Sequence, residues 1–422
     1  QALKKYQDTM IIDHFEKSLS SEETKRKLYL GILYALREYP CDRSVEILLN
    51  KMNDDDQEAY NEIVDSLIAI ARSHPMQEKK LENISNKIQT TANKLYYNYE
   101  MIKLLPDNEQ SFLMKDYLTN EIQNTLPTLL KLGVMDKPHT PIESYINTIR
   151  TGDNAKLPFL LEFFENIFSK KERAVINPLI EKITIEERSD IGHEHFNNLP
   201  RDLDKEISSL IFSKNKWESA ISFDYCVQSK KEEILKNLRW EQLPRSRANK
   251  EIIMRIAKDK GSLKNLIPSK LFETNSKELT MYSTLEKTII LKSVELFKSI
   301  PAENLSKVAQ ITEEVKYSKD EPIFSEGDYG DSLFIVVDGE VKIHKGEQEL
   351  AMLKKGACLG EMALLDDEPR SADATIKEES TLFKIEREGF YEVMAGQSVI
   401  MQGIIKLLTG RLRVANEKLM SK

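Results

Sequence analysis

Residues 327–376 read GDYGDSLFIVVDGEVKIHKGEQELAMLKKGACLGEMALLDDEPRSADATI, and this stretch decides how the C-terminal part of the chain folds. At its centre GEMALL, residues 360–365, is followed after three acidic residues by PRSA, residues 369–372. A glycine permits close backbone approach, and the first turn of a helix offers free N–H groups to an anion. Arg370 can return as a guanidinium fork for a phosphate. The stretch therefore predicts an anion site within a small β-structure.

Four segments occur in a fixed order between about Leu296 and about Leu412, namely LFKSIP, IFSEGDYGDSLFIVVDGEVKI, GEMALL and PRSA. In this combination the C-terminal part resembles the cyclic nucleotide-binding domain family. That family includes catabolite activator protein and the regulatory subunit of cAMP-dependent protein kinase. The resemblance implies a β-jelly-roll barrel with flanking helices, and a cyclic mononucleotide, cAMP or cGMP, as the ligand.

The resemblance also implies a role for each matching residue. Glu361 corresponds to the acid that accepts a hydrogen bond from the ribose 2′-hydroxyl, and Arg370 to the arginine that pairs with the cyclic phosphate. The residues expected to offer backbone N–H groups to the ligand are Gly360, Met362, Ala363, Ser371 and Ala372. The resemblance and the strand alternation together give three candidates for an apolar wall beside the base: Ile343, Leu350 and Leu353.

Simpler interpretations stand beside these roles. An arginine that follows Asp366, Asp367 and Glu368 is, taken alone, more often a surface ion-pair partner. Glu361 alone would more often be an acidic residue at a helix N-terminus. The three apolar residues would more often be ordinary core.

Two departures from the family pattern bear on the ligand. Asp373 occupies a position where many relatives have a small hydroxyl or apolar residue, and its charge would oppose a phosphate if it faced inward. The helix expected to close over the base is short, and offers Ile405, Leu408 and Leu412. Ser371 follows the arginine where a threonine often accompanies guanine recognition in the family, so we expect cAMP to be favoured over cGMP.

Composition limits the classes of function. The 422 residues carry a formal net charge of −8, which disfavours a protein that coats nucleic acid. No run of about 18 apolar residues occurs, so we expect no membrane span in this chain. The three cysteines are Cys41, Cys226 and Cys358, and their wide spacing suits a reducing, cytoplasmic compartment without disulfides or a zinc framework. The chain begins without methionine, so we expect a fragment, with a tether through a missing N-terminal segment as one option.

Glycine usage divides the chain. Five of the 15 glycines lie in the first 320 residues, and the other ten lie between Gly327 and Gly410. Turns that need a positive φ are thus concentrated at the C-terminal end, as many short strands require. We predict an α+β protein with a helical domain at 1–275, a connecting helix at 276–297 and a cyclic nucleotide-binding domain at 298–422.

The helical part resembles HEAT repeats weakly, through the helix pair on either side of Pro40. No regular period runs through residues 1–270, so a compact, irregular helical domain is the alternative. Ser20 and Glu23 have the spacing of a capping box before the helix that follows. In the C-terminal part Asp338-Gly339 is a hairpin signal.

Other constellations are weak. Gly192-His193-Glu194-His195 lacks further metal ligands, so surface histidines are the better interpretation and we predict no metal site. No nucleophile has a plausible base, so we do not predict an enzyme. Helices followed by a cyclic nucleotide module, with the TLEKTIILKSVELFKSIP junction, resemble soluble tails of bacterial nucleotide-transporter-like membrane proteins. We expect a regulatory module that senses a cyclic nucleotide and has a protein partner at its helical domain. The alternative is an interaction scaffold that no longer binds ligand.

Overall fold

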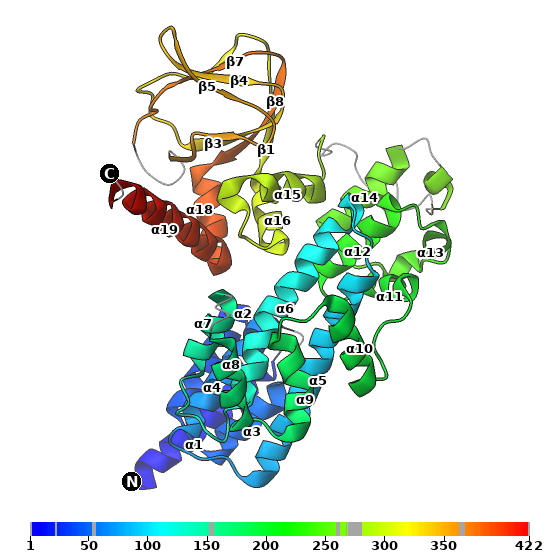
Figure 1. The fold of residues 1–422 in the computed structure, drawn as a ribbon, viewed down its shortest axis with the longest axis vertical. Coiled ribbons are helices and arrows are strands. Elements are labelled where there is room, and N and C mark those ends of the chain that lie inside the picture. The colour runs from blue at the N-terminus through cyan, green and yellow to red at the C-terminus, as the bar shows by residue number, and fades with distance from the viewer. Residues whose placement is uncertain are drawn as a thin grey trace. The chain divides into compact units, whose positions relative to one another are not determined.

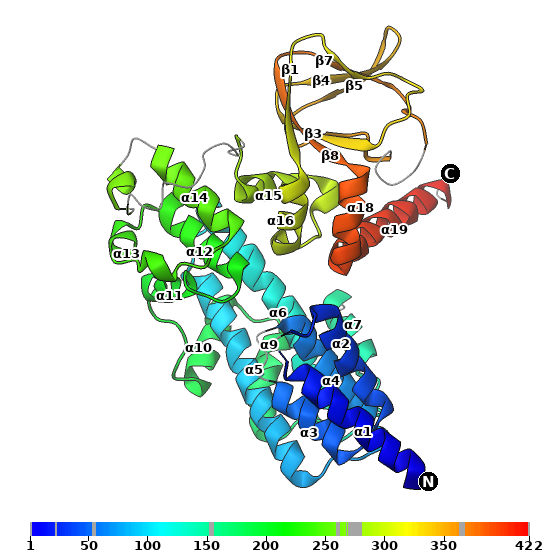
Figure 2. The same ribbon diagram turned by 180° about the vertical axis from the view of Figure 1, so that it is seen from behind.

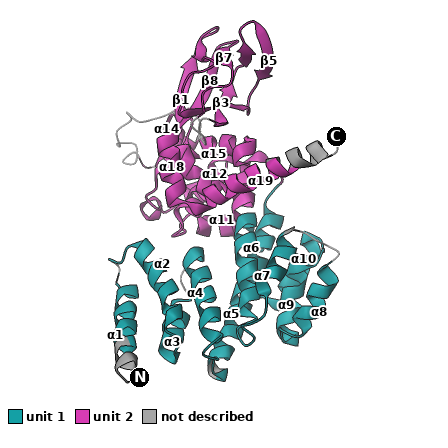
Figure 3. Ribbon diagram, turned by 90° about the vertical axis from the view of Figure 1, so that its left-hand side faces the viewer, with its two compact units in different colours: residues 1–106, 118–203 teal, residues 107–117, 204–422 magenta. Residues whose placement is uncertain are grey.

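The computed structural model describes eight stretches of the chain, residues 2–21, 23–52, 56–151, 156–258, 262–266, 268, 281–362 and 368–420. They form two compact units (Figure 3). The first unit comprises residues 1–106 and 118–203, and the second comprises residues 107–117 and 204–422. Residue 275, the predicted end of the helical domain, lies outside the described residues, so the domain boundaries stay predictions.

The first unit is built from helices (Figure 2). They pack on one continuous apolar core. Before residue 203 the described helices are α1 (Ala2–Leu19), α2 (Arg26–Ala35), η1 (Leu36–Glu38), α3 (Asp42–Lys51), α4 (Gln57–Ala71), α5 (Glu78–Leu104), η2 (Glu109–Ser111), α6 (Phe112–Leu132), α7 (Ile142–Thr151), α8 (Leu157–Glu165), α9 (Lys170–Ile180) and α10 (Ile185–His195). Of these, η2 and the first residues of α6 belong to the second unit. The helical N-terminal region is confirmed, whereas its HEAT-like repeat stays a prediction.

Local capping explains where several of these helices begin. Ser169 and Glu172 form a capping box before α9, and Thr184 and Glu187 form another before α10. The predicted capping box at Ser20 and Glu23 is wrong. The helix there, α2, begins only at Arg26, and the residue that precedes it is a lysine whose side chain makes no capping hydrogen bond.

Helices of the second unit precede and flank its sheets. They are α11 (Leu203–Leu210), α12 (Lys216–Gln228), α13 (Glu232–Lys236), α14 (Arg247–Lys258), α15 (Thr284–Ser293), α16 (Ala302–Ile311), α18 (Arg387–Gly396) and α19 (Ser398–Met420). The first helix of the flanking group, α15, starts with a capping box of Ser283 and Glu286. It lies within the predicted connecting helix at 276–297 but ends at Ser293, and after the extended Val294 the 3-10 helix η7 (Glu295–Phe297) follows.

Within the described residues, eight strands form two four-stranded antiparallel sheets that face each other as a barrel (Figure 1). The strands are β1 (Glu313–Tyr317), β2 (Pro322–Phe324), β3 (Ser332–Asp338), β4 (Val341–Lys345), β5 (Gln348–Leu353), β6 (Cys358–Leu359), β7 (Asp373–Ile376) and β8 (Ser380–Glu386). One sheet has the order β1-β8-β3-β6 and the other β2-β7-β4-β5. The predicted barrel with flanking helices is confirmed.

The turn at Asp338-Gly339 joins two sheets instead of two paired strands. Gly339 has a φ of +91°, as the hairpin prediction required, but β3 pairs with β6 and β8 while β4 pairs with β5 and β7. The predicted hairpin between β3 and β4 is therefore wrong. The turn at Gly346, with a φ of +56°, does connect a paired hairpin, β4 and β5.

Strand β3 is buried on both faces, which explains its unbroken apolar run. Leu333, Ile335 and Val337 pack into a core shared with α15, α16, α18 and α19. Phe334 and Val336 point the other way, into the core between the sheets. The strand thus connects the interior of the barrel to its helical layer.

Candidate functional site

The Arg370 side chain is the centre of the candidate site, and only 7% of the residue is exposed. Its Nη2 donates to the Ser332 carbonyl oxygen at 2.8 Å, and its Nη1 donates to the Gly360 carbonyl oxygen at 3.3 Å. The guanidinium carbon lies 4.3 Å from the centroid of the Phe324 ring, a cation–π distance. The Nε atom is buried without a hydrogen-bond partner. The guanidinium is therefore fixed in position but not fully satisfied.

No carboxylate neutralises this guanidinium at ion-pair distance within the part of the chain that the structure describes. Burial lowers the pKa of Arg370, and the nearby carboxylates of Asp331 and Asp328 oppose this effect. Glu368 is exposed, and Asp366 and Asp367 lie outside the described residues. A buried guanidinium without a carboxylate at ion-pair distance is stabilised when an anion binds beside it.

Two glycines allow the guanidinium to lie against the backbone. A Cβ atom at Gly330 would lie 2.5 Å from the guanidinium carbon, and one at Gly360 would lie 3.2 Å from it. Gly360 has a φ of +73°, so it is also required for its conformation, whereas the φ of Gly330 lies outside the left-handed region. At Gly330 a side chain is excluded only because the Arg370 guanidinium lies so close to the backbone.

A tight turn before β3 holds the backbone of Arg370. The Asp328 side chain accepts from Ser325 N at 2.8 Å, and the Asp328 carbonyl accepts from Arg370 N at 2.8 Å. Gly327 N donates to the Arg370 carbonyl at 2.9 Å. The sequence marked this segment only as a turn cluster, and the positions that contact Arg370 were not predicted.

Residues 360–372, which contain GEMALL and PRSA and are called the cassette below, differ in how far their side chains are exposed. Glu361 is half-buried and Met362 is 60% exposed, and both are in helical conformation. Ala363 lies outside the described residues. Ser371 is exposed, and Ala372 is buried at 8% exposure. The ligand contacts assigned to these residues stay predictions.

The three candidates for an apolar wall separate. Ile343 and Leu353 lie in the β4–β5 hairpin and pack against the core between the sheets. Leu350 is 48% exposed and lies beside a register shift in the same hairpin. The structure thus brings two of the three together and leaves Leu350 at the surface.

Asp373 faces away from the interior of the barrel. Ala374 and Ile376, which alternate with it on β7, are fully buried between the sheets. The Asp373 carboxylate accepts from Glu326 N at 2.9 Å and from Gly346 N at 3.4 Å. The hydrogen bond from Glu326 N is the main cause that lowers the pKa of Asp373. The carboxylate charge of Asp373 is therefore stabilised by backbone N–H groups of two turns and does not face the interior of the barrel.

The histidine segment contacts a buried carboxylate. His193 Nε2 lies 3.5 Å from a carboxylate oxygen of Glu100. No group of three or more His, Cys, Asp or Glu residues with a geometry for metal occurs in the described ranges. In the same ranges no helix combines the length and apolar character that crossing a bilayer needs.

Comparison with known proteins matches residues 314–397 to the family described as the cyclic nucleotide-binding domain. A cyclic AMP receptor protein of Thermus thermophilus is 33% identical over 134 residues, 31% of this chain and 62% of that protein. A cGMP-dependent protein kinase of Toxoplasma gondii is 33% identical over 135 residues, 32% of this chain and 14% of the kinase.

Among solved structures, the catabolite activator protein of Thermus thermophilus aligns at 30% identity with a TM-score of 0.27, covering 30% of this chain and 61% of that chain. The chain thus spans less than two thirds of the length of each of these relatives. The predicted resemblance of the C-terminal part is confirmed.

Proposed function

We propose that this chain senses a cyclic mononucleotide and transmits its binding to the helices around the barrel. The proposal rests on the match of residues 314–397 to the cyclic nucleotide-binding domain family. The proposed role is regulatory and not enzymatic. The ligand is cAMP in preference to cGMP, since Ser371 and not a threonine follows the arginine. A protein partner would bind at the helical domain.

The observation that carries this proposal is the state of the Arg370 guanidinium. It is buried, it has one donor without a partner, and the described residues give it no carboxylate at ion-pair distance. A buried charge in such a position is costly until an anion reaches it. A cyclic phosphate supplies that anion, and Glu361 would accept from the sugar hydroxyl.

The contacts of Arg370 also supply a route for the signal. Its Nη2 binds the carbonyl of Ser332, the first residue of β3, and the next residue, Leu333, packs into the core shared with the helices. That core contains Leu291 of α15 and Ile400 of α19. A phosphate that draws the guanidinium toward itself would therefore act on a strand that the helices rest on.

Helix α15 is connected to α14 as well as to the barrel. Glu251 of α14 accepts from Thr284 N at 2.7 Å and from Thr284 Oγ1 at 3.1 Å. Lys287 Nζ donates to the Thr312 carbonyl at 2.7 Å and lies 3.1 Å from Glu314 of β1. Movement of α15 against the barrel would consequently change its contacts with α14.

Hydrogen exchange with and without cAMP tests binding and transmission together. We expect protection to increase at 358–376 and to change at 283–297 and 398–415, because transmission requires two states that differ in ligand affinity. Changes confined to 358–376 would refute the transmission step. No change in any of these ranges would refute the proposal as a whole.

One observation favours the second candidate, an interaction scaffold without ligand. The guanidinium already has two carbonyl acceptors and the Phe324 ring, so the barrel does not need a phosphate to hold this arginine. The scaffold predicts that neither cAMP nor cGMP changes hydrogen exchange. A cytoplasmic location and an origin in a transporter-like membrane protein stay predictions from the sequence.

A further inference from the structure

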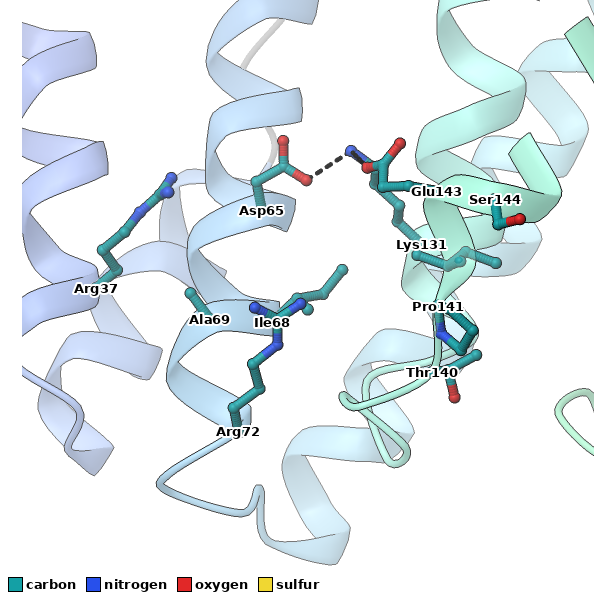
Figure 4. A pocket seen from close by; sticks show the side chains of 11 residues that line it. Arg37, Asp65, Ile68, Ala69, Arg72, Lys131, Thr140, Pro141, Glu143 and Ser144 are labelled. Atoms are coloured by element: carbon teal, nitrogen blue, oxygen red, sulfur yellow. Dashed lines mark hydrogen bonds and ion pairs between the residues drawn. The ribbon is translucent and has the colours of Figure 1, made fainter. Parts of the chain in front are cut away.

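A second site lies wholly within the first unit, in a pocket of about 330 Å³. Its walls come from η1, from α4, from the end of α6 and from the start of α7 (Figure 4). Its lining residues are Arg37, Asp65, Ile68, Ala69, Arg72, Lys131, Thr140, Pro141, Ile142, Glu143 and Ser144. The volume falls in the lower range of small-molecule sites, which are commonly about 300–1,000 Å³.

One end of the pocket is closed by ion pairs. Lys131 Nζ lies 2.7 Å from a carboxylate oxygen of Asp65 and 2.7 Å from one of Glu143, as the dashed lines show (Figure 4). The two carboxylates bind this one ammonium group, so Lys131 has no charge to spare for a ligand. Asp65 and Glu143 share this single ammonium, so this end of the pocket keeps a net negative charge and the anionic group of a ligand would lie at the other end, toward Arg72.

Two arginines keep donors that the protein does not use. Arg72 donates through Nε to the Pro138 carbonyl at 3.2 Å, and none of the described residues pairs a carboxylate with it. Arg37 pairs with Glu62 and with Ser66 Oγ, but its Nε is buried without a hydrogen-bond partner. The spare donors of the pocket therefore come from guanidinium groups, which suit carboxylate and phosphate.

The rest of the lining is apolar or neutral. Ile68 of α4 points across the pocket toward Pro141 (Figure 4), and Ala69 and Ile142 add to the apolar lining. Ile142 begins α7, so the positive end of a ten-residue helix also borders the pocket. Hydroxyl groups of Thr140 and Ser144 complete the wall.

We infer that this pocket binds a small organic anion, with its carboxylate or phosphate on Arg72 and its apolar body between Ile68 and Pro141. The inference is independent of the proposed cyclic nucleotide site, because every lining residue belongs to the first unit.

Calorimetry on the full chain at low ionic strength, with phenyl phosphate as the probe, tests the inference. Benzyl alcohol and benzylamine are the neutral and cationic probes of the same shape. We expect saturable binding of phenyl phosphate and none of the other two. Arg72→Gln should weaken it by about tenfold or more, because a charged hydrogen bond is lost. The matched control is Arg150→Gln, an exposed position in the last turn of α7, which should bind as the parent does.

An Arg370→Ala chain separates the two sites. Phenyl phosphate binding that survives in this variant and weakens in Arg72→Gln supports the inference, whether or not cAMP binds. Binding that is lost in Arg370→Ala and retained in Arg72→Gln would assign the anion to the barrel and overturn it. Absence of saturable binding to the parent, or stronger binding of benzylamine, would overturn it as well.

Discussion

Replacing Gly330 by alanine would place a methyl group against the guanidinium of Arg370. The added Cβ would lie 2.5 Å from the guanidinium carbon, closer than real Cβ contacts come. The backbone at Gly330 is not left-handed, so alanine is acceptable there in every other respect. The guanidinium is the mobile end of a long side chain, and we expect it to leave its place between Ser332, Gly360 and Phe324.

The size of the effect follows from the contacts that would be lost. The hydrogen bond from Nη2 to Ser332 is made by a charged donor, and such bonds contribute about 1.5–3 kcal/mol. Because the displaced guanidinium regains water, we expect the free energy of unfolding to fall by only about 1–2 kcal/mol, the lower part of the range for overpacking. Affinity for the cyclic phosphate should fall by about tenfold to a hundredfold, because the fork no longer points at it.

Calorimetry with cAMP and chemical unfolding of the same samples measure the two effects. Gly396→Ala is the matched control, since nothing lies within 4 Å of its added Cβ. Gly396 is the last residue of α18, one of the helices that flank the barrel. The control should bind as the parent does. A Gly330→Ala chain that binds cAMP with the affinity of the parent would refute the link between close approach at Gly330 and the position of Arg370.

Three further predictions follow from single groups. Arg370→Lys should bind cAMP more tightly than Arg370→Ala but less tightly than the parent, because an ammonium cannot form a two-pronged fork. Calorimetry that shows parental affinity for the lysine variant would contradict this. Lys287→Met should lower the free energy of unfolding in urea by about 3 kcal/mol, since the Glu314 carboxylate stays buried, although two N–H groups still bind it. An unchanged midpoint would contradict that role. Burial raises the pKa of the Cys226 thiol to about 12, so this thiol should react with a disulfide reagent at mildly alkaline pH only after unfolding. Rapid reaction in the native protein would show that α12 is not buried.

The cassette could be predicted because its signal is local in sequence. Gly360, Glu361 and Arg370 lie within eleven consecutive residues, so their order and spacing are visible without a structure. The partners of the arginine could not be found in this way. Ser332 contributes a backbone carbonyl 38 residues away, and Phe324 contributes a ring whose contact depends on the closure of the barrel.

The wrong hairpin prediction has a non-local cause. A positive φ at Gly339 is needed both in a hairpin and in a corner between sheets, and only the distant partner of β3, which is β8, distinguishes them. Helix α12 shows another limit of sequence patterns, because nearly every residue from Trp217 to Val227 is buried. A helix buried on all sides shows no amphipathic period.

Whether Arg370 holds a cyclic phosphate is measured by calorimetry of the full chain with cAMP and with cGMP. We predict saturable binding of both nucleotides, tighter for cAMP, and a loss of about tenfold to more than a hundredfold in affinity for Arg370→Ala with the fold intact. Absence of heat with millimolar nucleotide, or equal affinity of the parent and the alanine variant, would contradict the account.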